Sequence, residues 1–194
     1  AYALPKNLPG EEKKATGKEA QNYDNRIPGV SIHYKDAIEL VTKGASQVCL
    51  SVEQEIVTRT SRNIVARIEG TDKAEEILTL TAHYDSVPEG PGAYDNMSGA
   101  AIIMELCRYF HAHRTMEFIW FGAEEKGLLG SQNYIKIHEN ELFAHRFNMN
   151  VDLAGQLVGG TVAGVTGDAS VCSILTYMAH EIGIGMSTKN QIWG

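Results

Sequence analysis

The stretch Met116-Glu-Phe-Ile-Trp-Phe-Gly-Ala-Glu-Glu125 begins with an apolar run that predicts a buried strand and ends with two adjacent carboxylates. Side chains on neighbouring extended residues point in opposite directions, so Glu124 and Glu125 are expected to have different tasks. One carboxylate can bind a metal ion while the other accepts a proton from a water molecule beside it, as a metallohydrolase requires. Glutamate pairs are also common on solvated surfaces, so this interpretation depends on the rest of the chain.

The composition is that of an ordinary globular protein, with 43% hydrophobic and 21% charged residues in a chain of 194. This length suffices for one domain, or for one domain with a small addition. A net charge of -7 and the lack of a Lys/Arg-rich run argue against nucleic acid as the main partner. No stretch approaches the roughly 18 to 20 apolar residues of a membrane span.

The cysteines Cys49, Cys107 and Cys172 each lie in an apolar segment, and we expect buried, inert thiols. Their odd number argues against a disulfide framework and leaves a single bridge open. Near the start of the chain, Asp36 is expected to cap a short helix over residues 37–43. Two short strands are then expected, over residues 48–52 and 55–59.

After residue 60 the pattern alternates between strands and helices. The expected strands cover residues 63–68, 77–82, 116–121, 147–152 and 161–165. The expected helices cover residues 98–110, 128–137 and 169–182. The first two strands are expected to be neighbours joined by a polar turn. This alternation predicts an α/β fold, a three-layer sandwich with a mixed, mostly parallel sheet between helices.

The helix over residues 98–110 is expected to begin at a Ser98 cap. Its apolar residues Ala100, Ile103, Cys107 and Phe110 have helical spacing, which indicates a core-facing stripe rather than a binding surface.

The residues whose side chains could bind a metal ion or take part in catalysis fall at the expected strand ends or in a glycine-rich loop before a helix. They are His83, Asp85, Asp95, Glu124, Glu125 and Asp152. In a parallel sheet the carboxyl ends of the strands share one edge, where ligands bind. A mixed imidazole and carboxylate set suits zinc or a similar divalent ion.

Each of these motifs also has an ordinary interpretation. The His83-Tyr-Asp85 motif alone would be a surface turn, and Asp95-Asn96 between glycines would be a simple turn. Asp152 alone would serve equally well as a cap. Their joint occurrence, each after a separate expected strand, favours a metal site. The other histidines are expected at the surface or in the core.

The motifs match those of a known family. They are Ala82-His-Tyr-Asp-Ser86, Gly92-Ala-Tyr-Asp-Asn96, Phe121-Gly-Ala-Glu-Glu125 with Gly127-Leu-Leu-Gly-Ser131, and Asn150-Val-Asp-Leu-Ala-Gly155. In content, order and spacing the chain resembles the co-catalytic di-zinc aminopeptidases, metallopeptidase family 28. The resemblance implies a zinc exopeptidase-like fold and two zinc ions. It implies that Asp95 bridges the ions, that His83 and Asp152 bind the first, and that Glu125 binds the second.

The resemblance also assigns the catalytic groups. Glu124 would be the general base for the attacking water, and Asp85 would orient the His83 ring. The implied reaction is hydrolysis of the first peptide bond of peptides or proteins with a free N-terminus. A secreted or cell-surface location is favoured by the resemblance only.

The resemblance further suggests how the chain is organised. Residues 1–59 are expected to be a partial protease-associated-like segment, because residues 27–59 resemble the last part of such a domain. Residues 60–194 are expected to be the N-terminal portion of the zinc peptidase catalytic domain. The family's sixth metal residue, usually a His, would lie beyond Gly194, so we expect both ends to be cut and the fold to be incomplete at the C-terminus.

Two alternatives stay open at this point. The same fold can use zinc for another amide chemistry, such as glutaminyl cyclisation, but the presence of Asp95, Glu125 and Glu124 makes this less favoured. A non-catalytic binding module derived from the peptidase fold would be expected to have lost its metal ligands.

Overall fold

The computed structural model describes residues 30, 32–51, 57–110, 112–155 and 158–191. The chain divides into two compact units. The larger comprises residues 64–121 and 140–194, and the smaller comprises residues 1–63 and 122–139.

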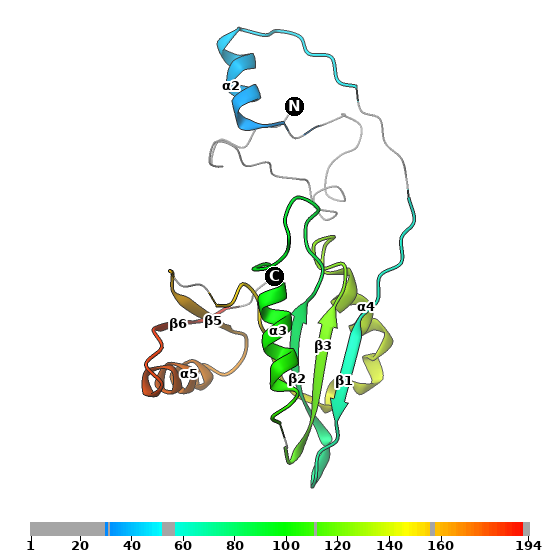
Figure 1. The fold of residues 1–194 in the computed structure, drawn as a ribbon, viewed down its shortest axis with the longest axis vertical. Coiled ribbons are helices and arrows are strands. Elements are labelled where there is room, and N and C mark those ends of the chain that lie inside the picture. Colours follow the sequence, from blue (N-terminus) through cyan, green and yellow to red (C-terminus); the bar gives the residue numbers. More distant parts are fainter. Residues whose placement is uncertain (1–29, 31, 52–56, 111, 156–157, 192–194) are drawn as a thin grey trace. The chain divides into compact units, whose positions relative to one another are not determined.

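A four-stranded sheet forms the centre of the larger unit (Figure 1). Its strands are β1 (Ile64–Ile68), β2 (Lys73–His83), β3 (Arg114–Phe121) and β4 (His145–Asn150), in the order β1-β3-β2-β4. Strand β2 runs parallel to both β3 and β4, whereas β1 is antiparallel to β3. The prediction of an α/β fold with a mixed, mostly parallel sheet is confirmed.

The expectation that the first two strands are neighbours is wrong, because β3 lies between them. The connection after β1 passes over the start of β3, where the Gly70 N–H donates to Thr115 Oγ1 at 3.1 Å. A Cβ on Gly70 would lie 2.5 Å from the His113 carbonyl oxygen, so a larger residue would not fit against this backbone. The polar segment after β1 therefore carries the chain across the start of β3 instead of closing a hairpin.

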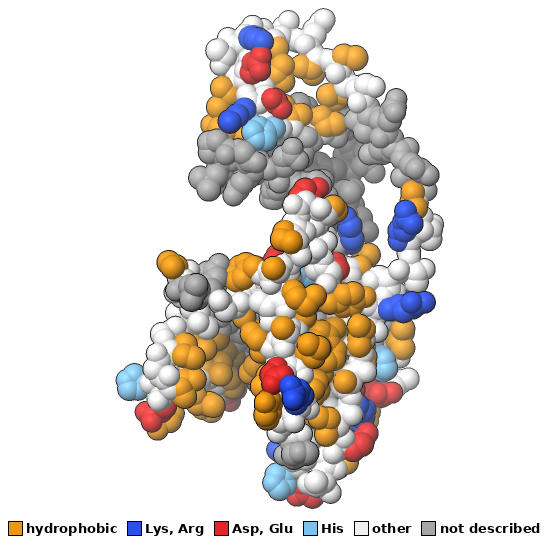
Figure 2. Space-filling view, viewed as in Figure 1, with side chains coloured by type: hydrophobic (Ala, Val, Ile, Leu, Met, Phe, Trp, Pro, Cys, Tyr) orange, Lys and Arg blue, Asp and Glu red, His pale blue; other side chains and the backbone are white. Residues whose placement is uncertain are grey.

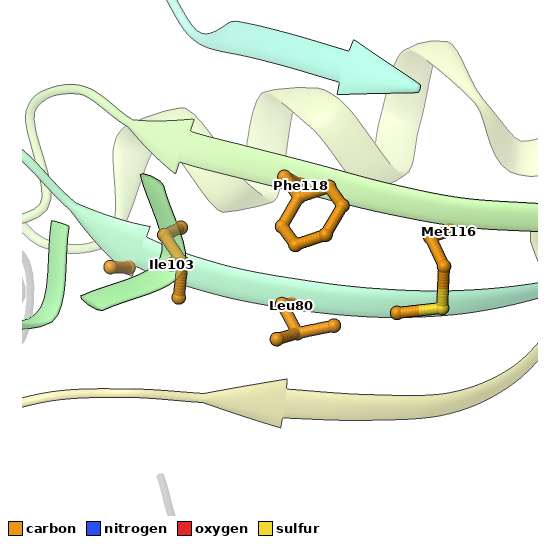
Figure 3. Packing of buried hydrophobic residues seen from close by; sticks show 5 residues of the cluster. Leu80, Ile103, Met116 and Phe118 are labelled. Carbon is orange, nitrogen blue, oxygen red and sulfur yellow. The ribbon is translucent and has the colours of Figure 1, made fainter. Parts of the chain in front are cut away.

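The hydrophobic core lies between this sheet and helix α3 (Met97–Leu106). Figure 3 shows Leu80, Met116 and Phe118 of the sheet gathered beside Ile103 of the helix. Phe118 and Ile103 are fully buried, and burying side chains of this size stabilises a fold by about 2–3 kcal/mol each. The core position of Ile103 confirms the predicted stripe. Other hydrophobic side chains reach the surface along α3 (Figure 2).

Helix α3 begins earlier and ends earlier than the sequence predicted. Its N-cap is Asn96 rather than Ser98, because the Asn96 side chain accepts a hydrogen bond from the Gly99 N–H at 3.1 Å. The helix ends at Leu106, and residues 107–109 form turns.

The larger unit also contains a parallel pair of strands joined through a helix. Strand β5 (Thr161–Val165) pairs with β6 (Met186–Asn190), and α5 (Ser170–Glu181) connects and contacts both. The predicted strand and helix are confirmed here, whereas β6 was not anticipated. A helix that crosses between parallel strands is the usual way to connect them.

The smaller unit contains α2 (Tyr34–Thr42) and α4 (Leu129–Ile137). The predicted Asp36 cap is wrong, because α2 begins after His33, whose side chain accepts from the Lys35 N–H at 3.2 Å. A short 3₁₀ helix (Glu139–Ala144) leads from the end of this unit towards β4.

The strands expected over residues 48–52 and 55–59 are absent from the described residues 48–51 and 57–59, whose side chains are exposed. Residues 52–56 lie outside the described residues. The apolar side chains of these described residues suggested strands, but a strand also needs a neighbouring strand to satisfy its backbone hydrogen bonds. The described residues here pair with no strand, which explains the error. The likeness of residues 27–59 to a protease-associated domain stays a prediction, and the domain division at residue 59 stays one as well.

All three cysteines are free. This agrees with the expectation, drawn from their odd number, that they form no disulfide framework. Burial is expected for each, but Cys49 is exposed, and Cys107 and Cys172 are only partly buried. Burial still raises the pKa of the Cys107 thiol. Within the described ranges, the longest and most apolar helices fall short of what a membrane crossing requires.

Candidate metal centre

Three donor side chains meet where β2 and β4 end. His83 is the last residue of β2, Asp152 follows β4, and Asp95 lies in the loop before α3. Because β2 and β4 are parallel neighbours, their carboxyl ends lie at the same edge of the sheet. The predicted convergence of these three residues is therefore found in the structure.

The donor atoms of this group lie within 4.8 Å of one another. His83 Nε2 is 3.0 Å from Asp95 Oδ1 and 3.6 Å from Asp152 Oδ1. The imidazole is only 4% exposed, whereas the Asp95 and Asp152 side chains are 49% and 39% exposed. The group thus has a buried nitrogen at its base and two carboxylates that open to solvent.

The other nitrogen of the His83 ring faces Asp85. His83 Nδ1 is 3.0 Å from the Asp85 carbonyl oxygen and 3.6 Å from its carboxylate oxygen Oδ1. A carbonyl oxygen can only accept a hydrogen bond, so this contact places a proton on Nδ1. In the neutral ring, the Nε2 lone pair then faces the carboxylates of Asp95 and Asp152.

This geometry calls for a positive charge between the groups. A lone pair and two carboxylate oxygens within 4.8 Å of one another repel one another unless a proton or a cation lies among them. A protonated His83 would satisfy this as an ion pair, and a divalent ion would satisfy it as a ligand set. The donor types favour the second, because one imidazole and two carboxylates match the ligands that zinc takes in proteins.

The loop that carries Asp95 is closed by backbone contacts. The Met97 N–H donates to the Gly92 carbonyl oxygen at 2.9 Å. Gly92 has φ +68°, a left-handed conformation that favours glycine, and a Cβ there would lie 2.7 Å from Ser86. The peptide bond between Asp95 and Asn96 is cis.

Glu124 and Glu125 lie in the smaller unit, in the segment from Gly122 to Leu128, which we call the glutamate loop. The preceding strand ends at Phe121 as predicted. The expectation that alternating extended residues separate the two glutamates is wrong, because the loop is folded into turns with Ala123 at φ +56°. Both glutamates are partly buried, and the Oε1 atom of Glu125 is shielded from solvent.

The Glu124 carbonyl oxygen organises this loop. It accepts hydrogen bonds from the N–H groups of Gly127 and Leu128, each at 2.8 Å. Asn63 adds two bonds, accepting from the Gly122 N–H at 3.2 Å and donating to the Gly130 carbonyl oxygen at 2.9 Å. The conformation of the glutamate loop is therefore fixed within its own unit.

Sequence reasoning overlooked the side chains that hold the donor residues in place. Asn96 was interpreted with Asp95 as part of a turn, and Ser98 as a helix cap. Asn96 is 1% exposed and donates to the Val151 carbonyl oxygen at 2.9 Å. An Asn directly before a helix is among the preferred N-caps, and that signal was available in the sequence.

The fold and the donor group define an α/β protein with a candidate metal centre at the edge of its sheet. A model of peptidase family M28 matches residues 63–190, so the chain belongs to peptidase family M28. Family membership, predicted from the motifs, is confirmed.

Known proteins with similar sequences and structures agree with this assignment. Aminopeptidase YwaD from Bacillus subtilis (strain 168) is 37% identical over 134 residues, which are 66% of this chain and 29% of the relative. The crystal structure of BSAP, a zinc aminopeptidase from Bacillus subtilis, matches with a TM-score of 0.59 and 32% identity, over 66% of this chain and 34% of that chain. This chain thus spans less than a third of the length of YwaD.

A glutaminyl cyclase from an Acidobacteriales bacterium shares the fold. Its structure matches with a TM-score of 0.57 over 66% of this chain and 52% of that chain, at 14% identity. An identity this low carries information about the fold alone.

Proposed function

We propose that this chain provides a zinc centre for aminopeptidase chemistry, the hydrolysis of the N-terminal peptide bond of a peptide or protein. The observation that carries the proposal is the convergence of His83, Asp95 and Asp152 in a chain of family M28. Relatives that are named aminopeptidases support the reaction class.

The distances within the donor group fit a small divalent ion. Zinc binds nitrogen and oxygen ligands at about 2.0–2.2 Å, which puts neighbouring ligands of a tetrahedral site about 3.4 Å apart. The separations of 3.0 Å and 3.6 Å from His83 Nε2 to the two carboxylates lie on either side of that value. The Nδ1 contact with Asp85 would hold the ring in the orientation and tautomer that ligation needs.

We further propose that the complete centre binds two zinc ions. Asp95 would bridge the ions, and its half-exposed carboxylate is accessible for a second contact. Glu125 would bind the second ion. Bound zinc supplies Lewis-acid activation of water and of the scissile carbonyl group.

Glu124 would take the proton from the attacking water and return it to the leaving amine. Its place in the chain supports this role, because the glutamate loop directly follows β3, whose last residue, Phe121, pairs with His83 of β2. Asp85 would act on the reaction only through the His83 ring.

A Glu124→Gln substitution tests the base. The amide keeps the size of the side chain but cannot accept the proton, so hydrolysis of an aminoacyl-4-nitroanilide should fall by about 10²- to 10⁴-fold. Zinc content, measured by atomic emission on dialysed protein, should stay unchanged. Glu105→Gln is the matched control, since Glu105 lies on the surface in an ion pair with Arg108.

The outcomes separate the parts of the proposal. Unchanged turnover in Glu124→Gln would show that another group is the base. If the unsubstituted chain retained no zinc, the proposed metal centre would be ruled out. A substrate with an N-terminal glutamine identifies the reaction, because hydrolysis releases free glutamine whereas cyclisation releases ammonia and leaves a pyroglutamyl peptide.

A further inference from the structure

The loop before α3 binds the backbone on both sides of Asp152. Asn96 donates to the Val151 carbonyl oxygen at 2.9 Å and accepts from the Leu153 N–H at 3.3 Å. The Tyr94 hydroxyl donates to the Leu153 carbonyl oxygen at 2.7 Å. We call the side chains of Tyr94, Asn96 and Ser98 the loop clasp.

Ser98 is the third residue of the loop clasp, and it binds both the backbone after Asp152 and the backbone of Tyr94. Its hydroxyl oxygen accepts from the Ala154 N–H at 3.2 Å, and the hydroxyl donates to the Tyr94 carbonyl oxygen at 2.7 Å. The loop clasp therefore contacts the backbone just before Asp152 and at the two residues after it.

Asn96 is the centre of the loop clasp. Its amide is almost fully buried and makes three hydrogen bonds to backbone groups, the third accepted from the Gly99 N–H. Asn96 is also the residue directly after Asp95. A shift of this one side chain would therefore move both carboxylates of the candidate metal centre relative to each other.

Helix capping alone does not account for these contacts. An N-cap needs only a side-chain oxygen, and Ser or Asp serves about as well as Asn. The bond from Asn96 Nδ2 to Val151 adds nothing to the cap. Close contact at Gly99 points the same way, because a Cβ there would overlap the Val151 carbonyl oxygen.

The backbone of Leu153 has an unfavourable conformation, and hydrogen bonds from the loop clasp stabilise it. Leu153 has φ +51°, a left-handed conformation that is unfavourable for a residue other than glycine. Its N–H is bound by Asn96 and its carbonyl oxygen by Tyr94. The backbone turns sharply at this point, directly after Asp152, and the loop clasp holds the turn.

We infer that Asn96, together with Tyr94 and Ser98, is a positioning residue that fixes Asp152 against Asp95 for metal binding. The inference rests on the proposed metal centre. It assigns the affinity for zinc in part to a side chain that does not touch the ion.

The first test is Asn96→Ser in the 194-residue chain. Serine keeps a capping oxygen but is too short to reach Val151 and has no amide to donate. Zinc affinity, measured by calorimetry on metal-free protein with zinc chloride, should weaken by about tenfold to a hundredfold, the usual effect of losing a group that orients a ligand. Circular dichroism before titration establishes that the variant is folded.

A matched control separates positioning from general loss of stability. Ile103→Val removes one methyl group from the core-facing side of the same helix and should lower the stability of the fold without touching the loop clasp. Its zinc affinity should equal that of the unsubstituted chain. An equal loss of affinity in Ile103→Val would overturn the inference.

A double-mutant cycle tests whether Asn96 acts through Asp152. In an Asp152→Asn background, Asn96→Ser should have much less effect on zinc affinity than in the unsubstituted chain, because the ligand that it positions is already impaired. Fully additive losses would show that the two residues act independently, which contradicts the inference.

The result also distinguishes this inference from the proposed function. If the unsubstituted chain binds zinc and folded Asn96→Ser binds it equally well, the inference fails and the metal centre stands. If the unsubstituted chain binds no zinc, both fail. Should Asn96→Ser not fold, Tyr94→Phe replaces it, since this removes only the hydroxyl bond to Leu153, and an unchanged zinc affinity in that variant would overturn the inference.

Discussion

The loop clasp beside Asp152 and the glutamate loop use different kinds of hydrogen bond. In the loop clasp, side chains bind backbone groups that lie more than 50 residues away in the sequence. In the glutamate loop, backbone N–H groups bind carbonyl oxygens only a few residues away, with Asn63 as a more distant support. The glutamate loop can therefore form from local interactions, whereas the donor group around His83 requires the folded sheet.

Gly99→Ala breaks the first region and should have the largest effect. Alanine in a helix is normally about 1 kcal/mol more favourable than glycine. Here the new methyl group would lie 2.6 Å from Asn96 Oδ1 and closer still to the Val151 carbonyl oxygen. Overpacking of this kind costs about 1–3 kcal/mol, so the unfolding free energy in urea should fall instead of rise.

Gly160→Ala is the matched control, because a Cβ at Gly160 would meet no atom within 4 Å. We expect its stability to stay close to that of the unsubstituted chain. A Gly99→Ala variant that is as stable as this control would show that the helix and the backbone around Asp152 are not in close contact.

Asn63→Ala breaks the second region. It leaves the buried Gly122 N–H and the Gly130 carbonyl oxygen without their side-chain partner, which should cost about 1–2 kcal/mol of unfolding free energy. Peptide hydrolysis should fall because the glutamate loop loosens, while zinc affinity at the His83 group should hold. Asn190→Ala removes a more exposed bond to Gly167 and serves as the control. Full activity in Asn63→Ala would contradict the role given to this support.

Glu76→Gln should have the smallest effect, because it lies near the other end of β2 from His83. Its hydrogen bond and ion pair with Arg114 lower the pKa of the Glu76 carboxyl group from its ordinary value of 4.5. A lowered pKa stabilises the fold above pH 4.5, and this contribution disappears as the pH falls through the folded-state pKa.

The variant should accordingly melt slightly below the unsubstituted chain at pH 7, since an ion pair that is partly open to solvent contributes little. The difference in melting temperature should shrink as the pH falls below 4.5 and disappear once the pH is below the folded-state pKa of Glu76. Zinc affinity should be unaffected. A difference in melting temperature that persists unchanged in acid would show that charge is not its cause.

The sequence was sufficient where local pattern decides the structure. Strand β3 and helix α5 were predicted correctly, because apolar runs and helical spacing are visible within short windows. His83, Asp95 and Asp152 were expected at one edge of the sheet, and their side chains lie together there. The mixed sheet followed from the alternation of strands and helices.

The errors arose where a distant contact decides between local options. Asn96 and Ser98 are both good caps, and the start of α3 depends on which of them also fits against Val151. The insertion of β3 between β1 and β2 is a matter of pairing across the chain, which periodicity does not report. The exposed Cys49 belongs to an apolar segment that pairs with no strand among the described residues.

The pairing of β4 with β2 also sets an order of events during synthesis. His83 and Asp95 leave the ribosome well before Asp152, and they meet it only when β4 has added to the edge of β2. A cation that needs all three side chains has no complete site on the shorter nascent chain. Binding of the proposed metal ion would therefore follow the pairing of β4 with β2, and the ion would have to be available to the folded sheet rather than to the growing chain.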